Sequence, residues 1–333
     1  MSVDKSELLE AEDPSRGVNL RVPCYSKIDE ETIRKNLEAD HFFWLDLEDP
    51  SEEDVMTLAR LFHFHPLALE DSEHFGQRPK LEEYDDFVFF VVYGAAPPPD
   101  VDRLVEVHLF YSENYLVSLR REHAPSCNEL RQRYAKKPGK LERPIVVLYR
   151  LLDSLSDSFF PALEDYDERI DGVEDDIFQG PREEQLQEIV RMKRSLNRLR
   201  RVVGPQRDVA GQLFGGATVL PGSDPEAERY FRDIFDHLIR VADLIDSYKD
   251  LLTGAMDVYL STVSNRLNVV TQRLTVIATL ALPLIVITGF FGQNFGFLVR
   301  HIDGWPAFVG YGVVAPLLLF AVLVVYLRRR DLA

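Results

Sequence analysis

Two long stretches without a charged side chain lie near the C-terminal end of this chain. The first, 274–291, reads LTVIATLALPLIVITGFF, and the second, 305–327, reads WPAFVGYGVVAPLLLFAVLVVYL. About 20 apolar residues in a helix, at a rise of about 1.5 Å each, span the hydrocarbon core of a bilayer. The sequence therefore predicts two transmembrane helices, 274–294 and 305–327, joined by an extracellular loop, 295–304.

The basic residues around these segments predict their orientation in the membrane. The tail 328–333 begins with three arginines, Arg266 and Arg273 precede the first helix, and the loop carries only Arg300. Because cytoplasmic flanks are enriched in arginine and lysine, both termini are expected in the cytoplasm, with the helices in the cell (inner or plasma) membrane. Two helices cannot enclose a water-filled path, so conduction would require several copies around an axis.

The part of the chain before the membrane segments is strongly charged, and the 333 residues together carry a formal net charge of −17. This acidity argues against a nucleic-acid partner, which needs basic surfaces, and it suits either cation attraction or simple solubility. Residues 1–17 have no basic start and no apolar run, so a solvated leader is expected and not a secretory signal. Cys24 and Cys127 form no CxxC pair, which argues against a disulfide framework or a structural zinc site.

Strand and helix signals alternate between residues 18 and 143. Runs such as HFFWLDL, DFVFFVVYG and YLVSLR are rich in β-branched and aromatic residues, and SEEDVMTLARLFHF reads as a helix with Ser51 as its N-cap. The pattern predicts a cytoplasmic α/β domain with a central sheet covered by helices. His63 and His65 lie two residues apart near the end of that helix and are expected to have structural roles.

Residues 144–213 are predicted to form a helical hairpin that turns at Gly180-Pro181. The first helix ends in an acidic segment and the second is basic, which favours antiparallel packing of the two. The acidic segment suits either a solvated face or an ion reservoir, and both interpretations stay open. Its acidic residues include Asp165, Asp167, Asp171, Glu174, Asp175 and Asp176.

A third helical region, 223–273, continues without a break into the first membrane segment. Ser223 and Glu226 have the spacing of a capping box, with Pro225 in the first turn. Apolar residues then recur with a period near 3.5 to 3.6, as on one face of a helix. A helix that runs to Phe291 would be about 100 Å long. We expect it to be a stalk that packs against copies of itself.

Several blocks of the sequence, taken in order, resemble the CorA-type divalent metal ion transporters over nearly the whole chain. The blocks are FHPLALED, QRPKLEEYDDFVFFV, YFRDIFDHLIRVAD, DVYLSTVSNRLN and TVIATLALPLIVITG. The family has Gly-Met-Asn where this chain has Gly292-Gln293-Asn294. The resemblance implies a funnel-shaped homopentamer in which each subunit gives one long pore-lining helix, with the second membrane helix in an outer ring.

The resemblance further implies that the chain conducts a divalent cation, first of all Mg²⁺, with Co²⁺, Ni²⁺ and Zn²⁺ as other candidates. Mg²⁺ releases its water reluctantly and prefers oxygen partners, so a ring of Asn294 amides could hold the hydrated ion weakly enough for it to leave. The alternative is that Asn294 caps the helix C-terminus. Gln293 is a departure from the family and leaves ion selectivity open.

The same resemblance implies which residues of the long helix face the pore. The expected residues follow a near-heptad spacing, and Leu274 and Leu282 could form apolar constrictions that gate by dewetting. Lateral packing between helices is the alternative for both leucines. The expected pore face comprises Asn268, Thr271, Leu274 or Thr275, Ala278, Leu282 and Gly289.

Regulation by intracellular Mg²⁺ is also implied by the resemblance. Asp233 matches an acidic sensor position, and its partner should be an acid on the neighbouring subunit, for which Asp100 and Asp102 are candidates. Bound ions would hold the ring closed, and their loss would shift the population toward an open state. The alternative is that Asp233 is an ordinary solvated residue.

Three functions therefore stand open at this point. The first is gated Mg²⁺ conduction, the second is Zn²⁺ transport by a branch of the same family, and the third is a membrane-anchored ion sensor or scaffold that conducts nothing. The sequence has no Ser/His/Asp arrangement, P-loop or dinucleotide fingerprint, so no enzyme is expected.

Overall fold

The computed structural model describes residues 22–136, 142–293, 296–301 and 304–329. The chain divides into two compact units, which are described separately below. The first unit contains the residues up to Glu174 together with Gln187–Gly254, and the second contains Asp175–Leu186 together with the residues from Ala255 onward.

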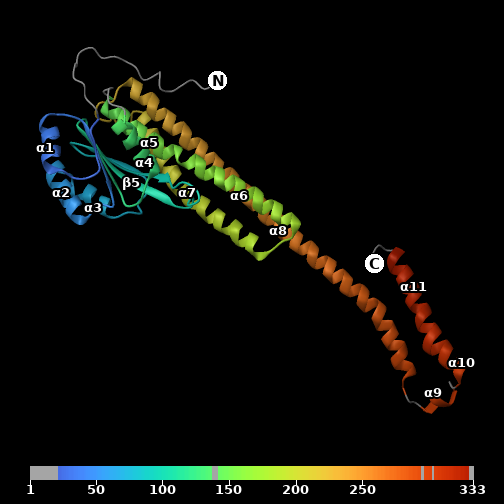
Figure 1. The fold of residues 1–333 in the computed structure, drawn as a ribbon. Helices are drawn as coiled ribbons and strands as arrows, with labels where there is room; N and C mark the ends of the chain where they lie inside the picture. Colours follow the sequence, from blue (N-terminus) through green and yellow to red (C-terminus); the bar gives the residue numbers. More distant parts are fainter. Residues whose placement is uncertain (1–21, 137–141, 294–295, 302–303, 330–333) are drawn as a thin grey trace. The chain divides into compact units, whose positions relative to one another are not determined.

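A six-stranded mixed sheet forms the centre of the first unit (Figure 1). The strand order is β1-β2-β6-β5-β4-β3; β1, β2 and β6 pair in parallel, and the remaining neighbours are antiparallel. Strand β4 is buried along its whole length, as its run of β-branched and aromatic residues predicts. The strands are β1 (Cys24–Tyr25), β2 (Phe43–Glu48), β3 (Lys80–Glu83), β4 (Val88–Ala95), β5 (Leu104–Tyr111) and β6 (Tyr115–Arg120).

Short helices accompany the strands, so the predicted α/β domain with a central sheet is confirmed. They are α1 (Glu30–Glu38), α2 (Glu52–Phe62), α3 (Pro66–Glu73) and α4 (Pro125–Lys136). Ser51 caps α2 in a capping box with Asp54. His63 ends α2 in the left-handed conformation, and the His65 ring accepts a hydrogen bond from the Leu67 amide at the start of α3. Both histidines therefore have the structural roles that the sequence predicts.

Three helices follow the sheet, namely α5 (Pro144–Asp157), α6 (Phe159–Gln179) and α7 (Glu183–Phe214). Side chains from this region form hydrogen bonds with the backbone of the part of β4 that does not pair with β3. Gln206 of α7 accepts a hydrogen bond from the Tyr93 amide at 2.7 Å and donates one to the Tyr93 carbonyl at 3.0 Å, and the Ser158 hydroxyl accepts one from the Ala95 amide at 2.8 Å. Since unpaired backbone groups are costly when buried, these bonds fix the helices to the sheet edge.

Helix α8 (Pro225–Phe291) is a single helix of 67 residues. The apolar stripe that the sequence predicts packs against the rest of the first unit, and its residues Phe231, Leu238, Ile245 and Leu252 are all buried. The predicted capping box is wrong in one detail. Asp224, and not Ser223, caps α8 by accepting a hydrogen bond from the Ala227 amide at 2.8 Å. Arg143 holds the Asp224 carboxylate in place, an interaction between distant residues that local spacing could not reveal.

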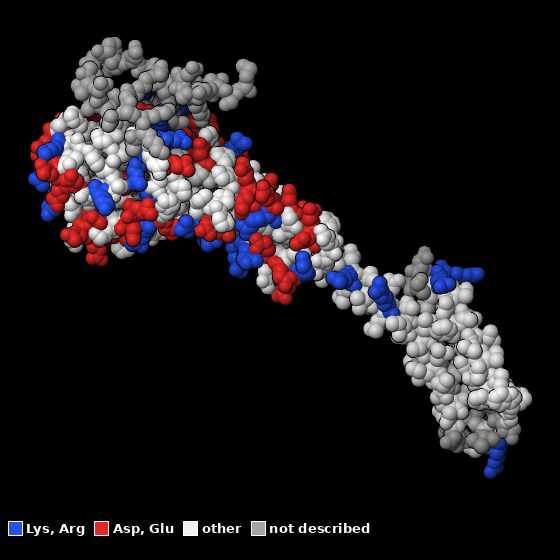
Figure 2. Space-filling model, in the orientation of Figure 1, with Lys and Arg blue, Asp and Glu red and all other residues white. Residues whose placement is uncertain are grey.

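Within the described part of the chain, two helices are long and apolar enough to cross a membrane. The first is the C-terminal part of α8. The second is formed by α10 (Trp305–Ala307), the π-helical segment η1 (Phe308–Val314) and α11 (Ala315–Arg329), and α9 (Gly296–His301) lies between. Phe291 stacks on Tyr311 with ring centroids 5.6 Å apart, which joins the two spans. On the face shown in Figure 2, the spans have no charged side chain between the basic residues near their ends.

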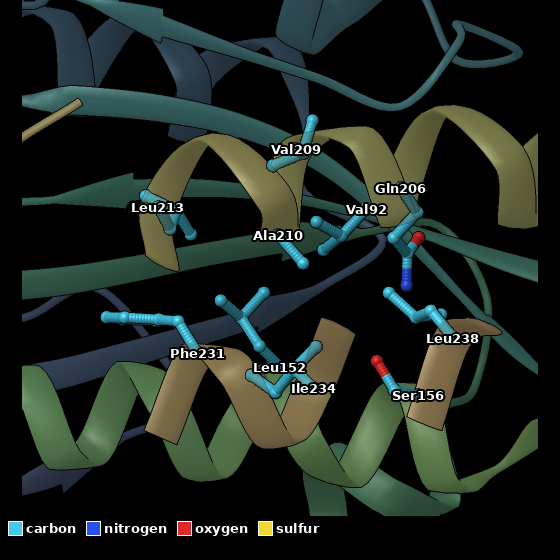
Figure 3. Close-up of a pocket in the computed structure, with 10 residues that line it drawn as sticks. All are labelled: Val92, Leu152, Ser156, Gln206, Val209, Ala210, Leu213, Phe231, Ile234 and Leu238. Carbon is cyan, nitrogen blue, oxygen red and sulfur yellow. The ribbon is translucent and has the colours of Figure 1, made fainter. Parts of the chain in front are cut away.

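A small cavity lies between β4, α5, α7 and α8 (Figure 3). Its volume of about 10 Å³ suffices for one water molecule at most. Its walls are apolar apart from Gln206, which is bonded to Tyr93, and Ser156, whose hydroxyl has no hydrogen-bond partner among the described residues. The cavity is therefore too small to be the binding site of a ligand.

The Gln206 contact gives a stability prediction. Gln206→Leu should leave a buried amide and a buried carbonyl of Tyr93 without partners, at a cost of about 2–5 kcal/mol. The unfolding temperature of the detergent-solubilised chain should fall clearly, whereas the exposed Gln212→Leu on the same helix should change it little. An equal effect of the two substitutions would contradict this role for Gln206.

Candidate cation pathway and regulatory cluster

The residues expected to face a pore all lie on α8 or in the turn that follows it. Every one of them is exposed in the single chain, with exposed fractions of 67% for Leu274 and 65% for Leu282. Gly292 donates a backbone hydrogen bond to the Thr288 carbonyl, and Gln293 donates one to the Phe290 carbonyl. Asn294 lies outside the described residues.

Apart from Leu274, the residues of the expected pore face fall on two heptad positions of α8. Asn268, Thr275, Leu282 and Gly289 follow one another at intervals of seven residues. Thr271 and Ala278 occupy the second position, which adjoins the first on the helix surface. Leu274 lies outside both positions, so of the two alternatives at this level the spacing favours Thr275.

A row of acidic residues that the sequence reasoning missed continues the second heptad position toward the N-terminus of α8. We call Asp236, Asp243, Asp250 and Asp257 the heptad aspartates, because seven residues separate each from the next. All four are exposed, and they lie away from the apolar stripe that packs on the first unit. Their seven-residue spacing is visible in the sequence, and residues spaced in this way lie on nearly the same face of a long helix.

The composition of these two positions is unlike that of a dry helix seam. A coiled coil places Leu, Ile or Val at its two core positions. In α8 the corresponding residues between 236 and 278 are Asp, Arg, Ser, Gly, Asn, Thr and Ala. If copies of α8 surround an axis with this face inward, the space between them is lined by polar and small side chains and can hold water and cations.

Asp233, the expected sensor residue, lies on α8 beside α5. Its carboxylate accepts a hydrogen bond from the Tyr149 hydroxyl at 3.2 Å and lies 3.7 Å from the His237 ring. Asp102 accepts a hydrogen bond from Tyr166 of α6. Asp100 lies in a turn, where its amide donates to the Pro97 carbonyl. The described contacts therefore place Asp233 with α5, and Asp102 with α6, in the same chain.

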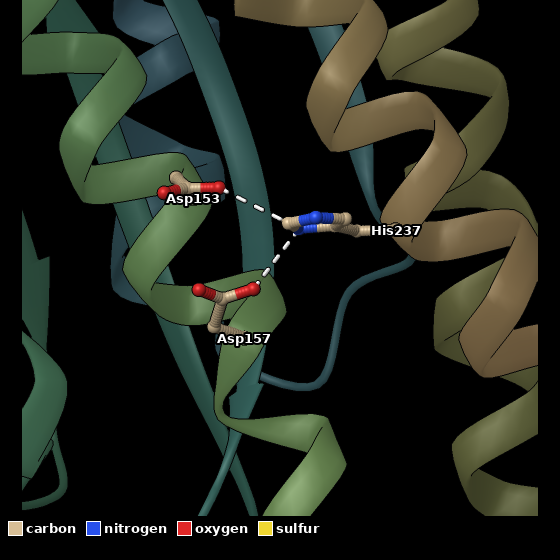
Figure 4. Close-up of side chains that lie close together, drawn as sticks. All are labelled: Asp153, Asp157 and His237. Carbon is tan, nitrogen blue, oxygen red and sulfur yellow. Dashed lines mark ion pairs between the residues drawn. The ribbon is translucent and has the colours of Figure 1, made fainter. Parts of the chain in front are cut away.

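The neighbours of Asp233 form a compact cluster with metal-binding chemistry (Figure 4). Asp153 and Asp157, one turn apart on α5, point toward His237 of α8. The His237 Nδ1 atom lies 3.0 Å from an Asp157 oxygen and 3.7 Å from an Asp153 oxygen. One ligand atom from each of the three residues lies within 4.8 Å of the others. Two carboxylates and an imidazole can hold a divalent cation.

Electrostatics in this cluster favour a positive charge. The hydrogen bond with Asp157 raises the pKa of His237 above its usual value near 6.5. Partial burial of the ring lowers this pKa, but the negative charges of Asp157, Asp233 and Asp153 raise it further. The sequence analysis did not identify His237 as a site residue. The sequence contains two pairs of residues with a spacing of four, Asp153 with Asp157 and Asp233 with His237. Each pair lies on one face of its helix, but only the packing of α5 against α8 brings the two pairs together.

The fold and this set of side chains define a class of protein: an acidic α/β domain followed by one continuous helix and two candidate membrane spans. The model of the CorA-like Mg²⁺ transporter family matches residues 39–329. The chain belongs to this family, which consists of transporters and not of enzymes.

Individual relatives agree with this assignment. The cobalt/magnesium transport protein CorA of Thermotoga maritima is 32% identical over 296 residues, which cover 86% of this chain and 82% of that protein. The complete structure of the CorA magnesium transporter from Methanocaldococcus jannaschii has the same fold, with a TM-score of 0.77 at 21% identity over 86% of this chain and 90% of that one. The zinc transport protein ZntB of Pectobacterium carotovorum is 27% identical over 198 residues, which cover 59% of this chain and 58% of that protein.

The raised pKa of His237 predicts how the stability of the cluster depends on pH. A histidine whose pKa is higher in the folded state stabilises that state fully below the unfolded pKa, and the contribution disappears as the pH rises through the folded value. The unfolding temperature of the wild type should therefore exceed that of His237→Gln at pH 5.5, and the difference should shrink above pH 8. The exposed His41→Gln, which removes an imidazole outside the cluster, serves as the control. A difference that is independent of pH would contradict the assignment.

Proposed function

We propose that this chain conducts Mg²⁺ across the cell membrane through a pore formed by several copies of α8 around a common axis. The observation that supports this most strongly is the polar heptad face of α8, which is unsuited to a dry helix seam. The family resemblance gives five as the number of copies. A membrane potential of 100 mV, negative inside, would favour inward movement of a dication by about 4.6 kcal/mol.

In this proposal the heptad aspartates line the cytoplasmic part of the path. Several copies would bring rings of carboxylates together, and such rings concentrate cations between low-dielectric walls. Further along α8 the lining changes to hydroxyl, amide and small side chains, and Leu282 forms an apolar constriction. Thr271 and Thr275 leave the intervening levels wetter than a leucine ring would.

Selectivity is assigned to Gly292, Gln293 and Asn294 at the end of the pore helix. A ring of neutral amide oxygens can bind Mg²⁺ through its retained water, which is weak enough to let the ion pass. Gln293 would add a second amide ring beside that of Asn294. The basic flanks of the two spans support an orientation with both termini in the cytoplasm.

Intracellular Mg²⁺ is proposed to regulate the pore at Asp233, with Asp100 or Asp102 supplied by a neighbouring copy. The cluster of Asp153, Asp157 and His237 beside it supports a cation site in this region. A dication there would screen the repulsion among carboxylates and favour the closed assembly. Because Asp233 and His237 lie on the same helix as the pore residues, occupancy of this site acts directly on α8.

Transport of Zn²⁺ is a second candidate, which the resemblance to a zinc transport protein and the unusual Gln293 favour. A competition series in liposomes separates the two: Mg²⁺ uptake that micromolar Zn²⁺ does not block supports Mg²⁺ conduction. A scaffold that conducts nothing would give no flux of either ion.

The selectivity assignment is tested by Asn294→Ala. This change removes the Asn294 amide ring and should lower the Mg²⁺ flux into liposomes at least about tenfold, because the proposed Gln293 ring would lie one residue away and would not supply oxygen atoms at the same level. The size of the assembly in detergent should stay the same, and Asn197→Ala, an exposed position on α7, serves as the control. Unchanged flux in Asn294→Ala would refute the assignment.

The heptad aspartates give a separate prediction. The double substitution Asp243→Asn/Asp250→Asn should lower Mg²⁺ flux about two- to tenfold at low ionic strength, because the local cation concentration falls with the loss of charge. The deficit should shrink above about 0.5 M salt, where the Debye length is only a few ångströms. Glu38→Gln/Glu83→Gln removes the same charge from exposed positions of the α/β domain and should leave flux unchanged. A deficit that is independent of salt would argue against an electrostatic role.

A further inference from the structure

Helix α7 carries an exposed row of arginines that the proposed pore does not use. Residues 191, 194, 198 and 201 are all arginine and all exposed, and their intervals of three, four and three residues place them on one face. We call these four residues the arginine row. It stands out on a chain whose formal net charge is −17.

Helix α6 of the same hairpin carries an exposed row of opposite charge. Glu164, Glu168 and Asp171 are exposed and follow at intervals of four and three residues, so they also share one helix face. We call them the carboxylate row. Side chains of both signs are visible on the hairpin in Figure 2.

The two rows do not neutralise each other within one chain. The half-buried pair of Arg169 and Glu188, 2.6 Å apart, provides the ionic contact between α6 and α7, and neither residue belongs to a row. Arg191 pairs with Glu188 on its own helix. Among the described residues, no ion pair joins an arginine of the one row to a carboxylate of the other. Like charges one turn apart repel, so each row favours a partner of opposite charge.

We propose that the arginine row of one copy binds the carboxylate row of the next copy in the assembly. This inference rests on the proposed function, because it requires several copies around an axis. In a closed ring each subunit offers two different surfaces to its two neighbours. Two rows of opposite sign on one hairpin meet this requirement, and their charge complementarity fixes the register and the choice of partner.

The contact between Arg169 and Glu188 sets the relative height of the two rows. At this level the carboxylate row lies opposite residues 186–193 of α7, while the arginine row occupies residues 191–201. The centres of the rows therefore differ by about seven residues, or about 10 Å along the helices. Neighbouring hairpins must be inclined to the ring axis for the rows to meet.

Charge reversal in the full-length chain tests the interface. Arg194→Glu/Arg198→Glu should raise the concentration at which the detergent-solubilised assembly dissociates at least about tenfold, because like charges then oppose each other across the contact. Glu164→Arg/Glu168→Arg should do the same, and the combination of all four changes should restore assembly. Assembly size is measured by light scattering and native mass spectrometry, at low and high salt. Lys27→Glu/Arg34→Glu, with the same change in net charge at exposed positions of the α/β domain, should have no effect.

The outcomes separate this inference from the proposed function. A wild-type chain that is monomeric at all concentrations would refute the ring itself. A stable wild-type ring that tolerates both charge reversals would refute only the interface. The interface would also be refuted if reversing Asp243 and Asp250, and not the carboxylate row, restored assembly of Arg194→Glu/Arg198→Glu. Loss of binding to phosphatidylglycerol vesicles in Arg194→Glu/Arg198→Glu, with the assembly intact, would show that the arginine row contacts lipid headgroups and would also overturn the proposal.

Discussion

A single helix meets two incompatible demands in this chain. One face of α8 is apolar and packs into the first unit, while the adjoining heptad face carries aspartate, serine, asparagine and threonine. Lipid cannot solvate such a face where the helix nears the membrane, and two spans cannot shield it. In the proposed ring, further copies of the helix would surround this polar face, and the other proposed features of the assembly depend on that arrangement.

The long helix depends in turn on its attachment to the sheet. An isolated helix gains little from propensity alone, and most helical stability in proteins comes from tertiary packing. Here α5 and α7 contribute that packing, and the side chains of Gln206 and Ser158 fix them to the open part of β4. The sheet, α5, α7 and the N-terminal part of α8 therefore belong to one compact unit.

Periodic features were predictable from the sequence, and contacts between distant elements were not. The α/β domain, the single long helix ending at Phe291 and the two spans all follow from hydrophobic period and length. The cap of α8 was misassigned because Arg143, far away in the sequence, stabilises Asp224. The cluster at His237 was missed for the same reason, since half of it lies on α5. The spacing of the heptad aspartates is visible in the sequence, but the stronger helical period of the apolar residues on α8 drew attention away from it.

Under the proposed function, a cation at this cluster would act on the same helix that carries the proposed constriction. Asp233 and Leu282 both lie on α8. A helix transmits a rotation or tilt along its axis without unfolding, provided that the far end is free to respond. In the proposed ring, the polar heptad face would meet this condition, because water between copies yields where an interlocked apolar seam would resist. The residues proposed to line a wet path would thus also allow the helices to move.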